Sequence, residues 1–214
     1  MNKHLVFAPA SLLILAGGRS RRFGEDKSQL RINGMLVAQM LIERLKGLFE
    51  QILISSDRPG KFDLPGVLEV VDEYSGKGPL GGVHAGMKAC SKPWVFVLAC
   101  DMPAIERNVV EEMLSAASAT TAQAIIPKHD AGYEPLCAMY SCDAFGTIEA
   151  LITQGGRPGM LDLLNKLDVV YLKTDNCYFN VNTPEDAARI QLQKQNSASQ
   201  RKPCYDNYFQ GQDK

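Results

Sequence analysis

The chain has 214 residues, a formal net charge of −1, 45% hydrophobic residues and 22% charged residues. This size and balance are typical of a soluble globular domain with a substantial core, and the small net charge does not indicate a nucleic acid or an anionic membrane as partner. The six cysteines form no Cys-x-x-Cys pair and have no histidine at metal-binding spacing. A zinc site is therefore not expected, and the cysteines are interpreted as thiols of a cytoplasmic protein, most of them buried.

The N-terminal residues resemble a signal peptide, with Lys3 and His4 before an apolar stretch. We expect no cleavage there, because cleavage would remove the first strand of the fold. No apolar run approaches the length of a membrane span. Residues 1–10 are interpreted as an N-terminal arm, 11–193 as one domain, and 194–214 as a flexible polar tail.

Strands and helices alternate along the first two thirds of the chain. Apolar runs predict strands at 12–15, 51–55, 67–71, 94–99 and 122–126. The helical spacing of apolar residues and a glycine-rich turn predict helices at 35–49, 79–90 and 106–117. Such alternation predicts a single-domain α/β fold, with a three-layer, doubly wound, mostly parallel sheet.

The last third of the chain is less regular. The run 133–141 predicts a strand across the sheet, and helices are predicted at 145–154 and 159–167, followed by a strand at 169–172. A threonine and a proline at 183–184 are typical of a helix N-cap and first turn, so a final helix is predicted to begin there.

A loop rich in glycine and arginine follows the first strand. The strand ends at Ala16, Gly17 and Gly18, and the loop then contains three arginines and ends at Lys27. Glycines let the backbone approach a ligand and direct N–H groups toward an anion. Clustered cations repel one another unless an anion lies between them, and a polyphosphate is the simplest such anion. The glycine spacing excludes a Walker A loop and the dinucleotide-binding fingerprint.

Three more polar residues, Ser55, Asp72 and Asp101, follow predicted strands. In a doubly wound sheet, ligands bind at the carboxyl ends of the strands, so we expect these residues to share an edge with the arginine-rich loop. Asp101 suits a hard divalent cation that bridges phosphates, because such a cation takes one or two carboxylates; a helix N-cap is the alternative. For Asp72, an ordinary strand-ending residue is nearly as good an interpretation.

The stretch LILAGGRSRRFGEDK, residues 13–27, resembles the signature loop of the molybdenum cofactor guanylyltransferase family. The positions that fit are Gly17, Gly18, Ser20, Arg22, Gly24, Asp26 and Lys27. The resemblance implies a Rossmann-like nucleotidyltransferase fold over residues 11–193. It also implies transfer of GMP from GTP to the molybdopterin cofactor, which releases pyrophosphate and forms the guanine dinucleotide cofactor.

The same resemblance implies roles for individual residues. The implied catalytic residues are Arg22, Lys27 and Asp101, with Asp101 as the ligand of Mg²⁺. The implied nucleotide-binding residues are Leu15, Ala16, Gly17, Gly18, Lys27, Ser55, Asp72, Gly78 and Asp101. Residues implied on the pterin side are Arg157, Asn180 and Asn182.

Some positions depart from the family pattern or allow a simpler interpretation. Ser55 stands where some members have a nucleotide-contacting asparagine, although serine still offers a hydrogen bond. Glu134 and Pro135 replace the His-Pro of some relatives, so the acceptor pocket is expected to differ in part. Asn180 and Asn182 alternate along an extended segment and would face one side; a pair of turn-forming asparagines is the alternative.

Two other functions remain open at this stage. The first is a cytidylyltransferase for the same pterin, although such relatives usually carry Ala-Ala-Gly where this chain has Ala16-Gly17-Gly18. The second is a non-catalytic module that binds a nucleotide and delivers cofactor to a partner enzyme. The expected partners are GTP, molybdopterin, and molybdenum-insertion and acceptor molybdoenzyme proteins, with no nucleic acid and no membrane.

Overall fold

One large β-sheet organises the chain in the computed structural model, which describes residues 7–17, 27–74, 76–130 and 132–174. The strand order is β10-β7-β9-β6-β1-β4-β5, and β8 pairs with β7. Its strands are β1 (Ala10–Leu15), β4 (Gln51–Ser56), β5 (Leu68–Val71), β6 (Trp94–Ala99), β7 (Ala124–His129), β8 (Gly132–Tyr133), β9 (Cys137–Ser141) and β10 (Val169–Lys173). Strand β1 runs parallel to β4 and β6, whereas β9 runs antiparallel to β6 and β7. The mostly parallel α/β sheet predicted from the sequence is confirmed.

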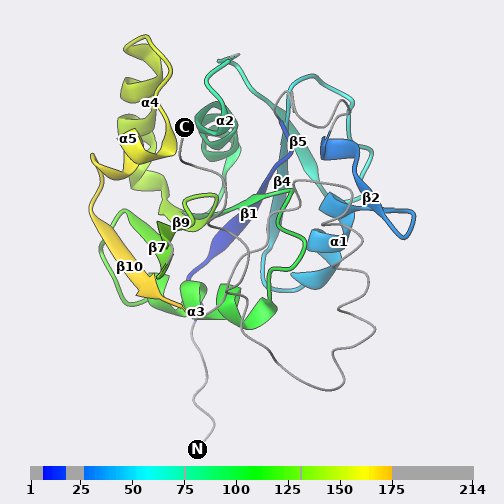
Figure 1. Ribbon diagram of the computed structural model, residues 1–214, viewed down its shortest axis with the longest axis horizontal. Helices are drawn as coiled ribbons and strands as arrows, with labels where there is room; N and C mark the ends of the chain where they lie inside the picture. The colour runs from blue at the N-terminus through cyan, green and yellow to red at the C-terminus, as the bar shows by residue number, and fades with distance from the viewer. Residues whose placement is uncertain (1–6, 18–26, 75, 131, 175–214) are drawn as a thin grey trace, which may run out of the picture.

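Helices cover both faces of this sheet (Figure 1). They are α1 (Val37–Arg44), α2 (Pro79–Ala89), α3 (Arg107–Ala117), α4 (Phe145–Thr153) and α5 (Met160–Leu164), with 3-10 turns η1 (Lys27–Gln29) and η2 (Cys142–Ala144). Side chains alternate along β1, so Leu12 and Ile14 join a core cluster with α1 and α3. Leu13 and Leu15 point the other way and join a cluster with α2, α4 and α5. One cluster lies on each face of the sheet, so the sheet and the helices on its two sides form three layers. Among the described residues, no helix has the length and apolar character needed to cross a membrane.

Two predicted elements differ from the structure, both at turn-forming residues. The helix predicted at 35–49 is shortened at both ends to α1. Asn33 and Gly34 take positive φ and form a small hairpin of β2 (Arg31–Ile32) and β3 (Met35–Leu36) before it, and Gly47 takes positive φ beyond its end. The strand predicted at 133–141 is divided into β8 and β9. The amide of Cys137 donates to the carbonyl of Glu134 and makes a turn between them. The helix predicted near residue 183 lies outside the described residues.

The contact of α2 with β1 predicts a sharp difference between two glycines. A Cβ on Gly86 would lie 2.2 Å from Cδ2 of the fully buried Leu13. Gly86→Ala should therefore lower the free energy of unfolding by about 1–3 kcal/mol. The matched control is Gly146→Ala in α4, where a Cβ meets nothing within 4 Å and alanine should raise helix stability by up to about 1 kcal/mol. Urea denaturation measures both, and equal effects would contradict the packing argument.

Candidate active site

The candidate site lies where the strand order of the sheet reverses. From β1 the chain moves to β4 on one side and later returns to β6 on the other, and such switch points open a crevice at the carboxyl ends of the strands. Backbone hydrogen bonds fix this edge. The amide of Ala16 donates to the carbonyl of Ser55 at 3.1 Å, and the amide of Cys100 donates to the carbonyl of Leu15 at 3.1 Å. These two bonds align the carboxyl ends of β1, β4 and β6.

These bonds limit what the first predicted residues can offer a ligand. Leu15 has its side chain in the core and its carbonyl bonded to Cys100. The amide of Ala16 is already used on Ser55. Gly17 is exposed, and a Cβ there would lie 3.7 Å from the backbone of Ser56. Leu15 and Ala16 therefore support the edge, and Gly17 begins the loop that leaves it.

Asp72 lies against the first turn of α2. A Cβ on Gly81 would lie 2.4 Å from Oδ2 of Asp72, so only glycine fits beside this carboxylate. The amide of Tyr74 donates to Oδ1 at 2.8 Å. Burial raises the pKa of Asp72 above its usual range, while the Tyr74 bond and the nearby His84 act in the opposite direction. The carboxylate is half-buried at the positive end of a helix.

Ser55 and Gly78 hold the same region from two sides. Ser55 is 2% exposed, and its Oγ lies beneath α2, where a Cβ on Gly82 would meet it at 2.7 Å. Gly78 has φ +62° and is the N-cap of α2, a conformation that other residues adopt only with strain. The amide of Gly81 closes the turn by donating to the carbonyl of Gly78 at 3.2 Å.

Asp101 lies in the turn that follows β6. The amide of Met102 donates to the carbonyl of Ala99 at 3.2 Å and forms that turn. Arg44 of α1 donates to the carbonyls of Pro103 and Ile105 and anchors the segment just beyond it. No sequence pattern indicates this role of Arg44, because its partners are distant in the chain.

A second carboxylate, Glu134, lies within electrostatic range of Asp101. Its Oε1 lies 3.3 Å from Nε2 of His129. Burial raises the pKa of Glu134 against the opposing effect of His129, and the Asp101 carboxylate adds to the increase. The substitution of the family's His-Pro by Glu134-Pro135 pointed to this position, but not to its pairing with His129.

Arg157 belongs to a loop that is tethered to the nucleotide side. The ammonium of Lys77, one residue before Gly78, donates to the carbonyl of Gly156 at 2.8 Å. The sequence did not indicate this bond, which joins the turn before α2 to the loop between α4 and α5. Arg157 is thereby placed near the loop that carries Gly78.

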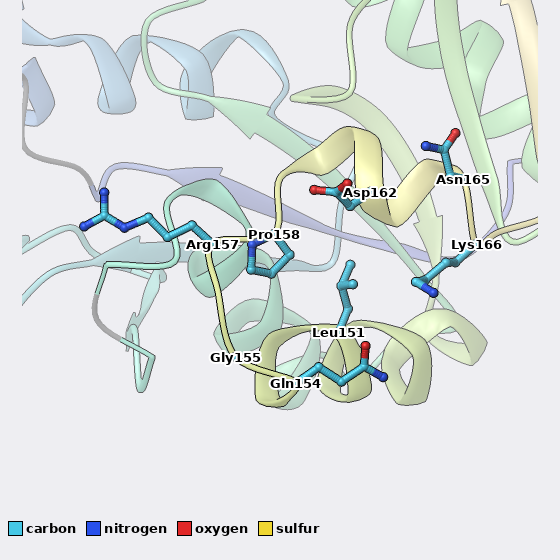
Figure 2. Close-up of a pocket in the computed structure, with 8 residues that line it drawn as sticks. All are labelled: Leu151, Gln154, Gly155, Arg157, Pro158, Asp162, Asn165 and Lys166. Atoms are coloured by element: carbon cyan, nitrogen blue, oxygen red, sulfur yellow. The ribbon is translucent and has the colours of Figure 1, made fainter.

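A hollow of about 550 Å³ lies beside this loop, between α4 and α5. Its lining residues are Leu151, Gln154, Gly155, Arg157, Pro158, Asp162, Asn165 and Lys166. Figure 2 shows that the Arg157 side chain extends away from the other lining side chains. Of the predicted site residues that the structure describes, Arg157 alone lines this hollow. We therefore do not assign the hollow to the nucleotide.

The structure thus brings Gly17, Ser55, Asp72 and Asp101 to one edge of the sheet, as the sequence predicted. Lys27 is the first residue of η1. The remaining predicted residues lie outside the described residues; they are Gly18, Arg22, Asn180 and Asn182.

Comparisons with known proteins agree with this geometry. The family model of the MobA-like NTP transferase domain matches residues 12–169. Molybdenum cofactor guanylyltransferase of Syntrophotalea carbinolica is 33% identical over 185 residues, which cover 82% of this chain and 88% of that protein. A probable molybdenum cofactor guanylyltransferase of Opitutus terrae is 35% identical over 187 residues, which cover 82% of this chain and 92% of that protein.

A solved structure has the same architecture. The crystal structure of molybdopterin-guanine dinucleotide biosynthesis protein A from Archaeoglobus fulgidus superposes with a TM-score of 0.73 and 26% identity, over 87% of this chain and 99% of that one. The match of the family model covers most of the sheet described above, including the edge with Asp72 and Asp101. The chain therefore belongs to the MobA-like NTP transferase family and is a nucleotidyltransferase.

Proposed function

We propose that this protein transfers GMP from GTP to the molybdopterin cofactor, releases pyrophosphate and forms the guanine dinucleotide cofactor. The observation that carries the proposal is the placement of Gly17, Asp72 and Asp101 at one switch-point edge of the sheet. The names of the relatives support molybdopterin as the acceptor. The terminal phosphate of molybdopterin attacks the α-phosphate of GTP. This oxygen is already ionised at neutral pH, so no strong protein base is required.

Asp101 is the proposed ligand of Mg²⁺, with Glu134 as the neighbouring carboxylate. The two lie close enough for Asp101 to raise the pKa of Glu134, and such a pair offers the hard oxygen ligands that Mg²⁺ prefers. Among the described residues, no group of three or more His, Cys, Asp or Glu side chains could hold a metal ion. Mg²⁺ needs only one or two carboxylates, because it keeps several waters and completes its shell with phosphate oxygens. When bound, Mg²⁺ supplies charge neutralisation on the triphosphate.

Arg22 and Lys27 are the proposed contacts of the phosphates. The transition state and the departing pyrophosphate gain negative charge on their outer oxygens, and fixed cations stabilise that charge. Gly17 and Gly18 let the backbone come close to the same phosphates. Positioning and charge stabilisation would then account for most of the rate, as in other phosphoryl transfers.

Asp72 and the turn from Gly78 to Gly82 are proposed to bind the base. A carboxylate only accepts hydrogen bonds, and guanine presents two adjacent donors, N1–H and the 2-amino group. Cytosine lacks this adjacent pair, which favours GTP over CTP. The contact of Asp72 with Gly81 fixes the carboxylate at the start of α2, where the turn that carries Gly78 lies beside it.

The pterin side is proposed to involve Arg157, Asn180 and Asn182. The Lys77 bond to Gly156 holds the Arg157 loop near the nucleotide turn, which supports a position between the two substrates. Molybdenum-insertion proteins and acceptor molybdoenzymes are the proposed protein partners. We also propose a cytoplasmic location, which is supported by the free thiols of the described cysteines.

The test is pyrophosphate release by the purified protein with Mo-molybdopterin, Mg²⁺, and either GTP or CTP. Release with GTP alone is expected. Release with CTP instead would keep the mechanism and overturn the choice of base. GTP binding without release from either nucleotide would favour the delivery module.

Asp101→Asn should lower kcat in this assay by at least about a hundredfold, because it removes the carboxylate that holds the cation near the reacting phosphates. The matched control is Asp168→Asn, an exposed carboxylate just before β10 at the opposite edge of the sheet. The control should keep the wild-type rate. Wild-type turnover by Asp101→Asn in Mg²⁺ would refute the metal assignment.

Asp72→Asn should have opposite effects on binding and on stability. It should weaken GTP binding about tenfold, the effect of losing a charged hydrogen-bond acceptor. Because the folded-state pKa of Asp72 is raised, the wild type loses stability as pH rises from the unfolded-state pKa through the folded-state pKa. The variant should therefore unfold with a higher free energy at pH 7, and this gain should vanish below about pH 3.8.

The control for Asp72→Asn is Glu73→Gln, whose carboxylate pairs with Lys88 on the surface at 2.8 Å. It should leave GTP affinity unchanged. Titration calorimetry and denaturation at the two pH values measure both effects. An unchanged GTP affinity in Asp72→Asn would return Asp72 to the role of a strand-ending residue.

Arg157→Ala should raise the KM for molybdopterin at least about tenfold, since a charged hydrogen bond to an anionic substrate is lost. The KM for GTP should change less than about twofold, well below the loss of such a bond. Lys166→Ala is the control, because Lys166 lines the same hollow from its other end (Figure 2). Steady-state kinetics with each substrate varied in turn measure the two KM values. A larger effect on GTP would move Arg157 to the nucleotide side.

A further inference from the structure

Two cysteines meet at the end of the sheet opposite the candidate site. Cys90 is the C-cap of α2, whose first turn lies beside Asp72. Cys142 follows β9 and opens η2, and its amide donates to the carbonyl of Pro93 at 2.8 Å. Both thiols are free, and both residues are half-buried.

The two sulfurs share one backbone partner. Sγ of Cys90 lies 3.2 Å from the carbonyl oxygen of Lys92, and Sγ of Cys142 lies 3.0 Å from the same oxygen. The Cys142 thiol lies near enough to Cys90 to influence its pKa. Ser11 Oγ lies 3.2 Å from Cys90 Sγ on the far side. The short segment before β6 thus holds two thiols next to each other.

Their surroundings give the two thiols different reactivity. The hydrogen bond from Cys142 lowers the pKa of Cys90 to about 6, against the opposing effect of burial, and the bond with Ser11 and the backbone amide and ammonium of Lys92 add to the decrease. The pKa of Cys142 is raised for the complementary reason. Cys90 is therefore the more readily ionised of the two thiols, and the thiolate is the nucleophilic form. Cys137, by contrast, is fully buried, and burial raises its pKa.

We propose that Cys90 and Cys142 form an oxidisable dithiol, in which Cys90 reacts first with hydrogen peroxide and Cys142 then closes a disulfide. The Cys90 sulfur attacks one peroxide oxygen; an S–O bond forms, the O–O bond breaks, and the departing hydroxide becomes water. The Cys142 sulfur then attacks the Cys90 sulfenic acid. An S–S bond forms, the S–O bond breaks, and the Cys142 proton leaves with the hydroxide as a second water. Two thiols are oxidised and one peroxide is reduced.

The disulfide would join two helices that both reach the candidate site. Helix α2 begins beside Asp72 and ends at Cys90. Helix α4 begins just after Cys142 and ends at the loop that Lys77 tethers. The two helices pack against each other, so the disulfide would fasten them at one end while the Lys77 bond fastens the other. This inference is independent of which nucleotide or acceptor the protein uses.

The test treats the full-length protein with a small excess of hydrogen peroxide at pH 7, followed by alkylation and peptide mapping by mass spectrometry. A peptide that links Cys90 to Cys142 is expected, reversible with dithiothreitol, while Cys137 remains a free thiol as the internal control. Before oxidation, iodoacetamide should label Cys90 at least about ten times faster than Cys142, as the difference in thiolate fraction requires.

Two variants separate the roles of the thiols. Cys142→Ser should stop the reaction at a sulfenic acid on Cys90 that dimedone traps, because no thiol is left to resolve it. Cys90→Ser should leave Cys142 unmodified under the same treatment. Disulfides that join other cysteines, or labelling of Cys90 as slow as that of Cys137, would overturn the proposal.

Discussion

The close contact of helix α2 with the sheet is the constraint on which the site depends. Glycines at three positions remove the Cβ atoms that would meet Asp72, Ser55 and Leu13. The helix therefore lies low on the sheet, and its apolar side chains fill the cluster shared with α4. The same approach brings the first turn of α2 to the carboxyl edge, where the half-buried carboxylate of Asp72 can face a positive helix end. The close approach of α2 therefore determines both the packing of this cluster and the geometry of the site.

The carboxylates of the edge are held in positions that do not favour their charge. Burial raises the pKa of both Asp72 and Glu134, so the folded protein carries them at a cost in stability. Such groups are common at functional sites, where the charge becomes useful once a ligand or cation arrives. Partners reduce the cost without removing it: the Tyr74 amide at Asp72 and the His129 ring at Glu134.

The sequence predicted the sheet well because its strands are short apolar runs, and the strand 94–99 matches β6 residue for residue. It predicted the 35–49 helix too long, since apolar spacing does not reveal the hairpin that turns at Asn33 and Gly34 or the positive φ of Gly47. The convergence of site residues followed from topology alone. The roles of Arg44 and Lys77 could not be foreseen, because each bonds a backbone carbonyl far away in sequence, and carbonyls carry no sequence signature.

The reversed strand β9 has a consequence for how the charge at the candidate site can change. Since β9 runs against its neighbours, its beginning lies at the edge where β6 ends, and Glu134 reaches the site from the residues before a strand. Those residues are still tied to the sheet, because the amide of Glu134 donates to the carbonyl of Pro127 and the carbonyl of Leu136 accepts from the amide of Ala99. A substitution of the Glu134 side chain alone can therefore change the charge at this edge while the backbone bonds of the segment and the strands stay in place.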